Sequence, residues 1–132
     1  MDFAPAAIDA LEAELERLGL GADTVCEDFF NYRPSIPFDS IYEQASLCAL
    51  PPQSWQRYSE QLFQWLRPGG ALLALFMQTG RSGGPPWHCD LLAMQRLFQP
   101  GRWLWPVSDG VMLDHPEGLR EQALILHKTS TK

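Results

Sequence analysis

Apolar residues recur at helical spacing in three stretches of the chain. In the first, they are 3, 4 and 3 positions apart with acidic residues between them, at Ile8, Leu11, Leu15 and Leu18. The second extends from about Ser54 to Leu66, with large apolar side chains on one face at Trp55, Tyr58, Leu62 and Trp65. The third follows Asp90, a suitable N-cap, with apolar residues at Leu91, Met94, Leu97 and Phe98. The spacing predicts three amphipathic helices, with Pro5 in the first turn of the first one.

Between these helices lie short stretches typical of β-strands. The apolar run Ala71–Met77 is too short for a core helix and follows glycines, so it predicts a strand buried on both faces. Pro68-Gly69-Gly70 is expected to end the preceding helix with a left-handed cap. Further strands are predicted at Thr24–Asp28, Phe38–Glu43, Arg102–Trp105 and Gln122–His127, the last two joined by a turn-rich segment from Pro106 to Gly118. Helices that alternate with strands indicate an α/β fold with a mostly parallel sheet.

Length, charge and cysteine content narrow the function classes. The chain has 132 residues, which is typical of one domain. Its formal charge of -6 repels phosphate backbones, so nucleic acid is not expected as a partner. The cysteines, Cys26, Cys48 and Cys89, form no CxxC pair and are odd in number, which indicates neither a disulfide framework nor a zinc site. No metal site is expected, and the compartment is predicted to be reducing.

Membrane insertion and export are not expected from the sequence. The longest apolar run, Ala71–Met77, is less than half of the roughly 20 residues that span a bilayer. The N-terminus has no basic region followed by an apolar stretch, so no signal peptide is visible. We therefore expect a cytoplasmic protein that has no membrane partner.

Polar residues follow three successive strand positions. Asp2-Phe3 comes where a strand would end and the first helix begin, Asp28-Phe29 follows the Thr24 strand, and Glu43-Gln44 ends the Phe38 strand. Ligand sites of parallel sheets are built at this carboxyl edge. A carboxylate at Asp2 suits a ribose diol, and the ring of Phe29 suits a base. The alternatives are an acidic residue that complements the helix dipole and a turn with two core phenylalanines.

A further candidate is the glycine- and proline-rich loop from Gly83 to Cys89. It combines a rigid turn with the aromatic ring of Trp87, as a lid over a small apolar substrate would. The alternative is a structural loop around a buried tryptophan. His88 and Cys89 are adjacent and so point to opposite faces of an extended chain, which argues against a shared metal.

Taken in order, these motifs resemble class I S-adenosylmethionine-dependent methyltransferases, and more narrowly the thiopurine S-methyltransferase family and its bacterial relatives. The segment Phe38–Pro51 is similar to that family's fourth strand and following loop. Leu66-Arg67-Pro68-Gly69-Gly70 with the strand after it, and Gly84-Pro85-Pro86-Trp87, match its Leu-x-Pro-Gly-Gly turn, fifth strand and substrate-side loop. The resemblance implies an incomplete doubly wound, Rossmann-like sheet, mostly parallel with an antiparallel C-terminal strand.

The resemblance also implies roles for individual residues. The residues implied to bind the cofactor, S-adenosyl-L-methionine, are Asp2, Phe3, Asp28, Phe29, Glu43 and Gln44. Gln44 departs from the family, because several relatives carry arginine there. Cys48, Pro86 and Trp87 fall on the substrate side. The implied reaction is direct displacement at the sulfonium methyl by a thiol or another soft small-molecule nucleophile, which needs mainly alignment and desolvation.

The resemblance covers residues 1–132 as one truncated methyltransferase-like domain. Family members begin with an N-terminal cover, a first strand, a glycine-rich loop and a second strand, none of which is found here. We therefore expect weak or no activity from this chain alone. The alternative is a non-enzymatic remnant that acts as a dimerising or partner-binding module, with a homodimer formed through an exposed sheet edge.

Overall fold

The computed structural model describes residues 1–130, in which the chain divides into two units, Met1–Pro34 and the part from Ser35 onward. Each unit is described by itself. No helix among the described residues is long and apolar enough to cross a membrane.

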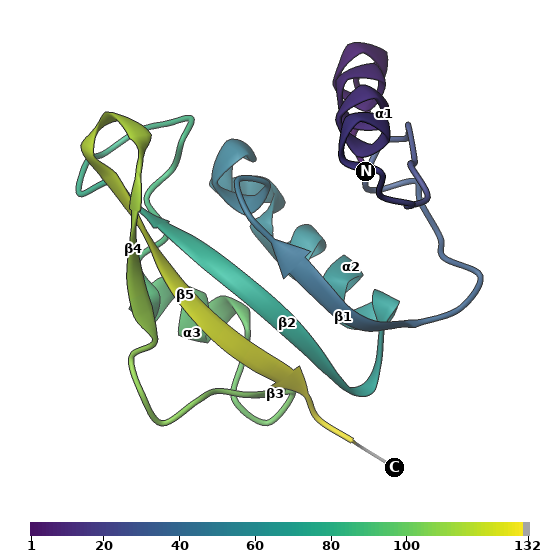
Figure 1. The fold of residues 1–132 in the computed structure, drawn as a ribbon. Helices are drawn as coiled ribbons and strands as arrows, with labels where there is room; N and C mark the ends of the chain where they lie inside the picture. The colour runs from purple at the N-terminus through teal and green to yellow at the C-terminus, as the bar shows by residue number, and fades with distance from the viewer. Residues whose placement is uncertain (131–132) are drawn as a thin grey trace. The chain divides into compact units, whose positions relative to one another are not determined.

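The first unit consists of a helix and a short extended segment. Helix α1 (Pro5–Leu18) has Pro5 in its first turn, as the sequence predicts, and ends at Gly19, which adopts φ +66° (Figure 1). The strand predicted at Thr24–Asp28 is wrong in extent, because it is reduced to one parallel bridge between Asp2 and Cys26. The partner segment is short: Asp2 donates to the Val25 carbonyl oxygen and accepts from the Glu27 amide, and the chain turns into α1 at Pro5. On the other side, the Asp28 carboxylate accepts from the Phe30 amide, and this turn ends the extended backbone.

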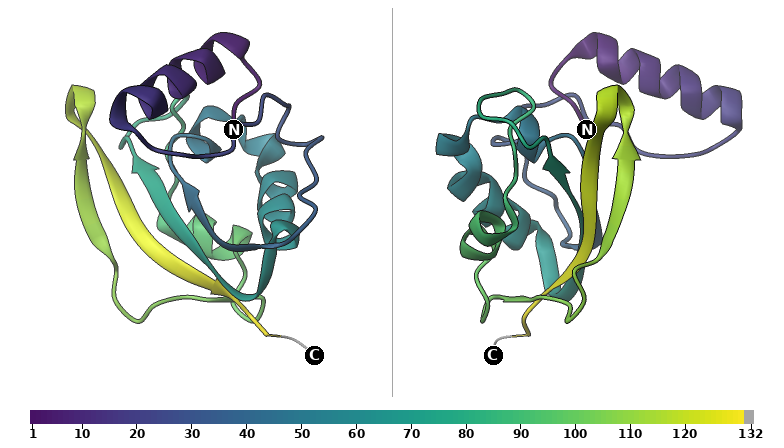
Figure 2. Two further views of the ribbon diagram at one scale, coloured as in Figure 1. Left: turned by 45° about the vertical axis from the view of Figure 1, so that its right-hand side comes forward. Right: turned by 90° about the vertical axis from the view of Figure 1, so that its left-hand side faces the viewer.

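The second unit is a mixed sheet covered on one face by helices (Figures 1 and 2). Its strand order is β1 (Phe38–Glu43), β2 (Leu66–Gln78), β5 (Leu119–Lys128), β3 (Trp103–Leu104), with β4 (Val111–His115) also paired to β5. The β1–β2 ladder is parallel, and β5 is antiparallel to β2, β3 and β4. The predicted α/β fold with an antiparallel C-terminal strand is confirmed. The expectation of a mostly parallel sheet is wrong for the described residues, because three of the four ladders between named strands involve the antiparallel strand β5.

Helix α2 (Trp55–Trp65) leads directly into β2. Leu66 is already extended, so the helix ends before Pro68-Gly69-Gly70, and the predicted glycine cap is wrong. These residues instead form an irregularity in the β1–β2 ladder, where Phe38 pairs with Leu66 and Ser40 pairs with Ala71. Gly70 is required there, because a Cβ would lie 2.9 Å from the Arg67 carbonyl oxygen and 3.0 Å from that of Asp39.

Strand β4 is absent from the sequence prediction, which treats Pro106 to Gly118 as turns. It pairs with β5 from Val111↔Ala123 to His115↔Leu119, and a short 3-10 turn (Pro116–Gly118) connects the two strands. Four of its five residues are exposed, so it carries no alternation of buried and exposed positions by which the pattern could reveal it.

The core of the second unit lies between the sheet and helices α2 and α3 (Leu91–Leu97). Tyr58, Leu62 and Trp65 of α2 are buried, as their spacing predicts. The rings of Phe98 and Trp105 lie 5.8 and 6.1 Å from that of Phe76, centroid to centroid. Asp90 caps α3 by accepting from the Ala93 amide at 3.2 Å, as predicted.

Strand β1 stands at one end of the strand order. An edge position is what a homodimer through the sheet requires, so the homodimer stays a prediction.

Candidate functional site

In the first unit, the bridge between Asp2 and Cys26 brings the Asp2-Phe3 and Glu27-Asp28 segments side by side. The Asp2 Oδ1 accepts a hydrogen bond from the Ala4 amide at 2.8 Å, and the Asp28 Oδ1 accepts from Phe30 at 2.9 Å. Each carboxylate therefore uses one oxygen to shape its own turn. Phe3 is 77% exposed, whereas Phe29 is half-buried with its ring edge-on to that of Phe30. A carboxylate beside an exposed aromatic ring is chemically suited to a ribose and a purine.

In the second unit, Glu43 ends β1 and is only 3% exposed. Its Oε1 accepts a hydrogen bond from the Leu47 amide at 2.7 Å and one from the Tyr58 hydroxyl at 3.3 Å. Burial raises the pKa of Glu43, and the charge of Glu121 adds to the rise. Glu43 thus holds the loop after β1 against α2, and its Oε1 is occupied within the protein.

Gln44, the next residue, is exposed and belongs to a hydrogen-bonded chain across the sheet edge. Its Oε1 accepts from the Tyr42 hydroxyl at 2.8 Å, and its Nε2 donates to Glu121 Oε2 at 3.0 Å. Glu121 lies in β5, opposite Met77 of β2, and is 2% exposed. The two carboxylates and the amide form the polar group at this end of the sheet.

The two loops predicted to face the substrate are joined by a backbone contact. The Trp87 amide donates to the Cys48 carbonyl oxygen at 2.8 Å, and the Cys89 amide donates to Met77 at 2.8 Å. Burial, with the charges of Glu43 and Glu121, raises the pKa of Cys48 to about 11. Burial raises that of Cys89 to about 12. Both thiols are therefore protonated at neutral pH and unsuited to act as nucleophiles.

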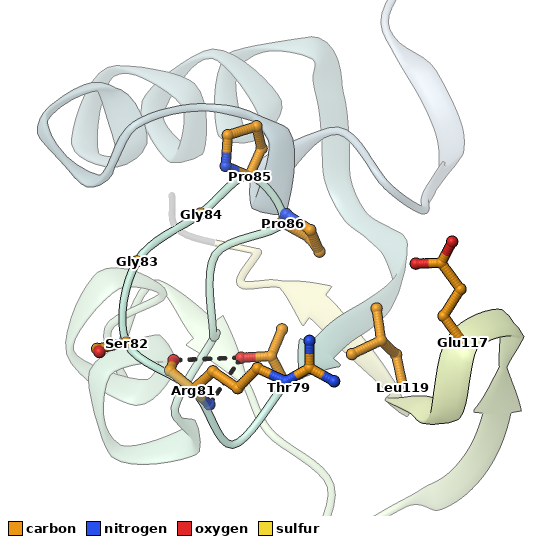
Figure 3. A pocket seen from close by; sticks show the side chains of 9 residues that line it. All are labelled: Thr79, Arg81, Ser82, Gly83, Gly84, Pro85, Pro86, Glu117 and Leu119. Atoms are coloured by element: carbon orange, nitrogen blue, oxygen red, sulfur yellow. Dashed lines mark hydrogen bonds between the residues drawn. The ribbon is translucent and has the colours of Figure 1, made fainter.

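A hollow of about 230 Å³ lies between the loop after β2 and the start of β5 (Figure 3). One wall is the loop, which contributes Thr79, Arg81, Ser82, Gly83, Gly84, Pro85 and Pro86. The other wall is formed by Glu117 and Leu119. Pro86 therefore borders the hollow, as a substrate-side residue would. His88, next in the loop, accepts through Nδ1 from the Thr79 and Gly80 amides, so it shapes the loop from within.

The Gly84 backbone lies against the indole of Trp87. A Cβ at this position would be 2.6 Å from both Cγ and Cδ2 of the ring. Gly84→Ala is therefore expected to displace the indole, to shift the Trp87 Nε1–H resonance and to cost roughly 1–3 kcal/mol of stability. Gly83→Ala is the control for the Trp87 signal, because a Cβ there has nothing within 4 Å, although its φ of +82° is expected to cost about 1–2 kcal/mol of stability by itself. An unmoved Trp87 signal in Gly84→Ala would contradict this close packing.

Sequence reasoning missed Glu121 and the hydrogen bond from Tyr58 to Glu43. Glu121 lies in a segment predicted as a strand, where a charged residue is expected on the solvent side. It is buried because Gln44 and the unpredicted strand β4 flank it. Tyr58 was predicted on the buried face of α2, and its hydroxyl gave no sign of a partner.

The model of the thiopurine S-methyltransferase family matches residues 7–124. The chain belongs to this family. The predicted family is therefore confirmed, and S-adenosylmethionine-dependent methyltransferases are also among the solved structures that share the fold. The cofactor predicted above, S-adenosyl-L-methionine, is the one this group of proteins uses.

Relatives within and near the family include bacterial and plant enzymes. A thiopurine S-methyltransferase of Methylococcus capsulatus is 34% identical over 104 residues, covering 76% of this chain and 47% of that protein. A thiopurine S-methyltransferase of Vibrio atlanticus is 40% identical over 73 residues, which cover 54% of this chain and 33% of that protein. Thiocyanate methyltransferase 1 of Arabidopsis thaliana is 31% identical over 77 residues, covering 58% and 34%. The chain thus spans between a third and a half of the length of these thiopurine and thiocyanate methyltransferases.

The fold is shared with solved methyltransferases at low sequence identity. A SAM-dependent methyltransferase of Methanosarcina mazei matches with a TM-score of 0.76 at 18% identity, covering 98% of this chain and 81% of that one. A Burkholderia thailandensis 1,6-didemethyltoxoflavin-N1-methyltransferase, solved with S-adenosylhomocysteine bound, matches with a TM-score of 0.68 at 17% identity, covering 90% and 56%. These likenesses confirm the Rossmann-like methyltransferase fold.

Proposed function

We propose that these residues carry the later part of a methyltransferase site that transfers the methyl group of S-adenosyl-L-methionine to a thiol or another soft small-molecule nucleophile. The observation that carries the proposal is the family match together with the meeting of two loops, after β1 and after β2, through the contact of Trp87 with Cys48. Thiol, thiopurine and thiocyanate methyltransferases are among the relatives.

The residues of the first unit fit one part of the cofactor. Asp2 uses only its Oδ1 in the turn before α1, which leaves Oδ2 to accept from a ribose diol, and the exposed ring of Phe3 provides a face for adenine. We assign Asp28 and Phe29 to the adenine side as well. When bound, the cofactor supplies an activated methyl group; Asp2 would hold the ribose and orient it.

The residues of the second unit fit the substrate side. Glu43 acts by holding the loop that contains Cys48, since its Oε1 is occupied by Leu47 and Tyr58. Gln44 is exposed at the same strand end and can reach the methionine portion or the substrate. Pro86 borders the hollow, and the half-buried Trp87 would exclude water from a soft nucleophile.

We further propose that the chain alone binds the cofactor weakly, because the glycine-rich loop and first strand of the family fold are not among its residues. An NMR titration of the 132-residue chain with S-adenosylhomocysteine tests both the assignment of the cofactor-binding residues and the weak binding. Shifts are expected at the Asp2–Ala4 and Glu27–Phe30 amides, with a Kd weaker than about 100 μM.

A matched pair of variants makes this titration specific. Asp2→Asn is expected to weaken binding by roughly tenfold, because a charged acceptor of hydrogen bonds is lost. Asp9→Asn on the exposed side of α1 is expected to leave the affinity unchanged. Micromolar binding by this chain would contradict the weak-binding proposal, and no shift at millimolar ligand would contradict the cofactor assignment.

A further inference from the structure

Two side chains of opposite charge belong to opposite walls of the hollow. Arg81 is part of the loop after β2, and Glu117 is part of the turn between β4 and β5. Figure 3 shows the Arg81 side chain extending from its loop toward the wall that contains Leu119 and Glu117. Among residues 1–130, neither charged group has an ion-pair partner within 4.0 Å. The hollow therefore presents one uncompensated positive and one uncompensated negative group.

Hydrogen bonds at the base of the loop fix the backbone of Arg81. Its amide donates to Thr79 Oγ1 at 3.1 Å, and the Thr79 hydroxyl donates to the Arg81 carbonyl oxygen at 3.3 Å (Figure 3). The amide of Gly80, the residue before it, donates to His88 Nδ1 at 3.2 Å. These contacts use main-chain groups of Arg81, so its guanidinium keeps its donors for a ligand.

Glu117 has a backbone conformation that L-amino acids rarely adopt. Its φ is +67° and its ψ is 25°, which makes it one of two non-glycine residues with positive φ within residues 1–130. Glycine or asparagine is the usual residue in this conformation. Strained backbone of this kind is concentrated at ligand sites, where the position of a side chain matters more than local stability. The conformation thus points to a role for the Glu117 carboxylate.

The two charges together define the ligand that fits the hollow. A ligand with only an anionic group would pair with Arg81 but be repelled by Glu117, and one with only an ammonium group would leave Arg81 unpaired. A ligand that carries both a carboxylate and an ammonium group can pair with both walls. The volume of about 230 Å³ is below the roughly 300–1,000 Å³ of sites for drug-sized ligands, so the ligand is small.

We propose that the hollow selects a small amino-acid thiol as the methyl acceptor, with Arg81 binding its carboxylate and Glu117 its ammonium group. The role of this ligand as the acceptor rests on the function proposed above. The methionine end of the cofactor carries the same two groups. The acceptor is the better candidate, because neither the loop after β2 nor the β4–β5 turn contains a residue assigned to the cofactor.

NMR titrations of the full chain, under reducing conditions and without cofactor, test this selection. Three thiols of similar size serve as probes: L-cysteine, cysteamine, which lacks the carboxylate, and 3-mercaptopropionate, which lacks the ammonium group. Binding is followed at the Arg81 Nε–H and at the Gly118 amide. L-Cysteine is expected to bind roughly fivefold more tightly than either of the other two, which is the strength of a good exposed ion pair.

Two variants assign each charge to its partner. Arg81→Gln is expected to remove the preference for L-cysteine over cysteamine and to keep that over 3-mercaptopropionate. Glu117→Gln is expected to do the reverse. Arg96→Gln, at an exposed position of α3, is the control and is expected to leave both preferences unchanged. Equal affinity of the wild type for the three thiols, no binding of L-cysteine, or preferences that survive both variants would overturn the proposal.

A last comparison separates the acceptor from the cofactor. S-Adenosylhomocysteine carries the amino-acid group and 5′-methylthioadenosine lacks it. If the first ligand shifts the Arg81 and Gly118 signals and competes with L-cysteine, while the second does not, the hollow belongs to the cofactor and the acceptor assignment is overturned. Signals that respond to L-cysteine alone support it. The proposed cofactor site is read independently at the Asp2–Ala4 amides, so its failure and the failure of this proposal are distinguishable.

Discussion

Replacing Glu43 with alanine is expected to destabilise the second unit by about 2–4 kcal/mol at pH 7. The carboxylate is 3% exposed and accepts hydrogen bonds from the Leu47 amide and the Tyr58 hydroxyl. Alanine removes this acceptor and leaves a cavity where the side chain was. Urea unfolding followed by tryptophan fluorescence measures the effect, because all 5 tryptophans lie beyond Ser35 and report on the second unit.

Glutamine at the same position is expected to behave differently. Its oxygen can still accept from Leu47 and Tyr58, but it carries no charge. Because burial raises the pKa of Glu43, the folded state binds the proton more tightly than the unfolded state. The stability that this proton contributes is full below the ordinary glutamate range and is lost as the pH rises through the raised pKa. Glu43→Gln is therefore expected to be at least as stable as the wild type at pH 7.

The pH dependence of stability separates the loss of the hydrogen-bond acceptor at position 43 from the loss of its charge. The stability of the wild type relative to Glu43→Gln is expected to decline as the pH rises from the ordinary glutamate range to neutrality, whereas Glu43→Ala is less stable than Glu43→Gln throughout. Glu60→Ala serves as the control, since Glu60 forms a part-exposed ion pair with Arg102 and its loss is expected to cost about 1 kcal/mol or less. A wild type that gains stability relative to Glu43→Gln over this pH range would contradict the direction of the pKa shift.

Gly110→Ala is expected to disrupt the pairing of β4 with β5. Gly110 precedes β4 with φ +78°, and a Cβ there would lie 2.1 Å from the Ala123 carbonyl oxygen. No rotation of a flexible side chain can relieve a clash with the backbone, so the strand has to move. We expect a loss of about 3 kcal/mol or more, together with faster amide exchange along Val111–His115.

Gly118→Ala isolates the contribution of backbone conformation. Gly118 lies at the other end of β4 with φ +74°, but a Cβ there has nothing within 4 Å. The substitution is expected to cost about 1–2 kcal/mol from the left-handed conformation alone. Equal losses in the two variants would show that the contact with Ala123 is not what requires glycine at position 110.

The strands and helices that could be predicted are those whose buried face is visible in the pattern of apolar and polar residues. Ala71–Met77 is recognised as a strand because an uninterrupted apolar run of this length is too short for a core helix. Helix α2 is recognised in the same way, because its apolar face repeats at helical spacing. Strand β4 is missed because its exposed side chains show no period. The glycine cap is misassigned because Pro68-Gly69-Gly70 is equally suited to end a helix or to form a bulge.

The candidate site is predictable to the extent that it follows from topology. Parallel strands bring their carboxyl ends to one edge, which is how Asp2-Phe3, Asp28-Phe29 and Glu43-Gln44 were selected together, whereas the loop after β2 was selected for its rigid turn and the ring of Trp87. Glu121 is 77 positions beyond Gln44 and belongs to the antiparallel strand, so no motif connects them. Its burial depends on packing by β1 and β4, which the local sequence around Glu121 does not encode.

The irregularity between β1 and β2 separates two parts of the chain with different tolerance to changes in length. From Phe38 to Ser40 there are two steps on β1, while their partners Leu66 and Ala71 are five steps apart on β2. A residue removed from the surplus shortens a bulge that is already out of step with its neighbour. A residue removed from Ala71–Met77 would turn each following side chain to the opposite face and shift its pairing with β1 and β5 by one position. The bulge is therefore the part of β2 where a change in chain length is expected to leave the register of Ala71–Met77 unchanged.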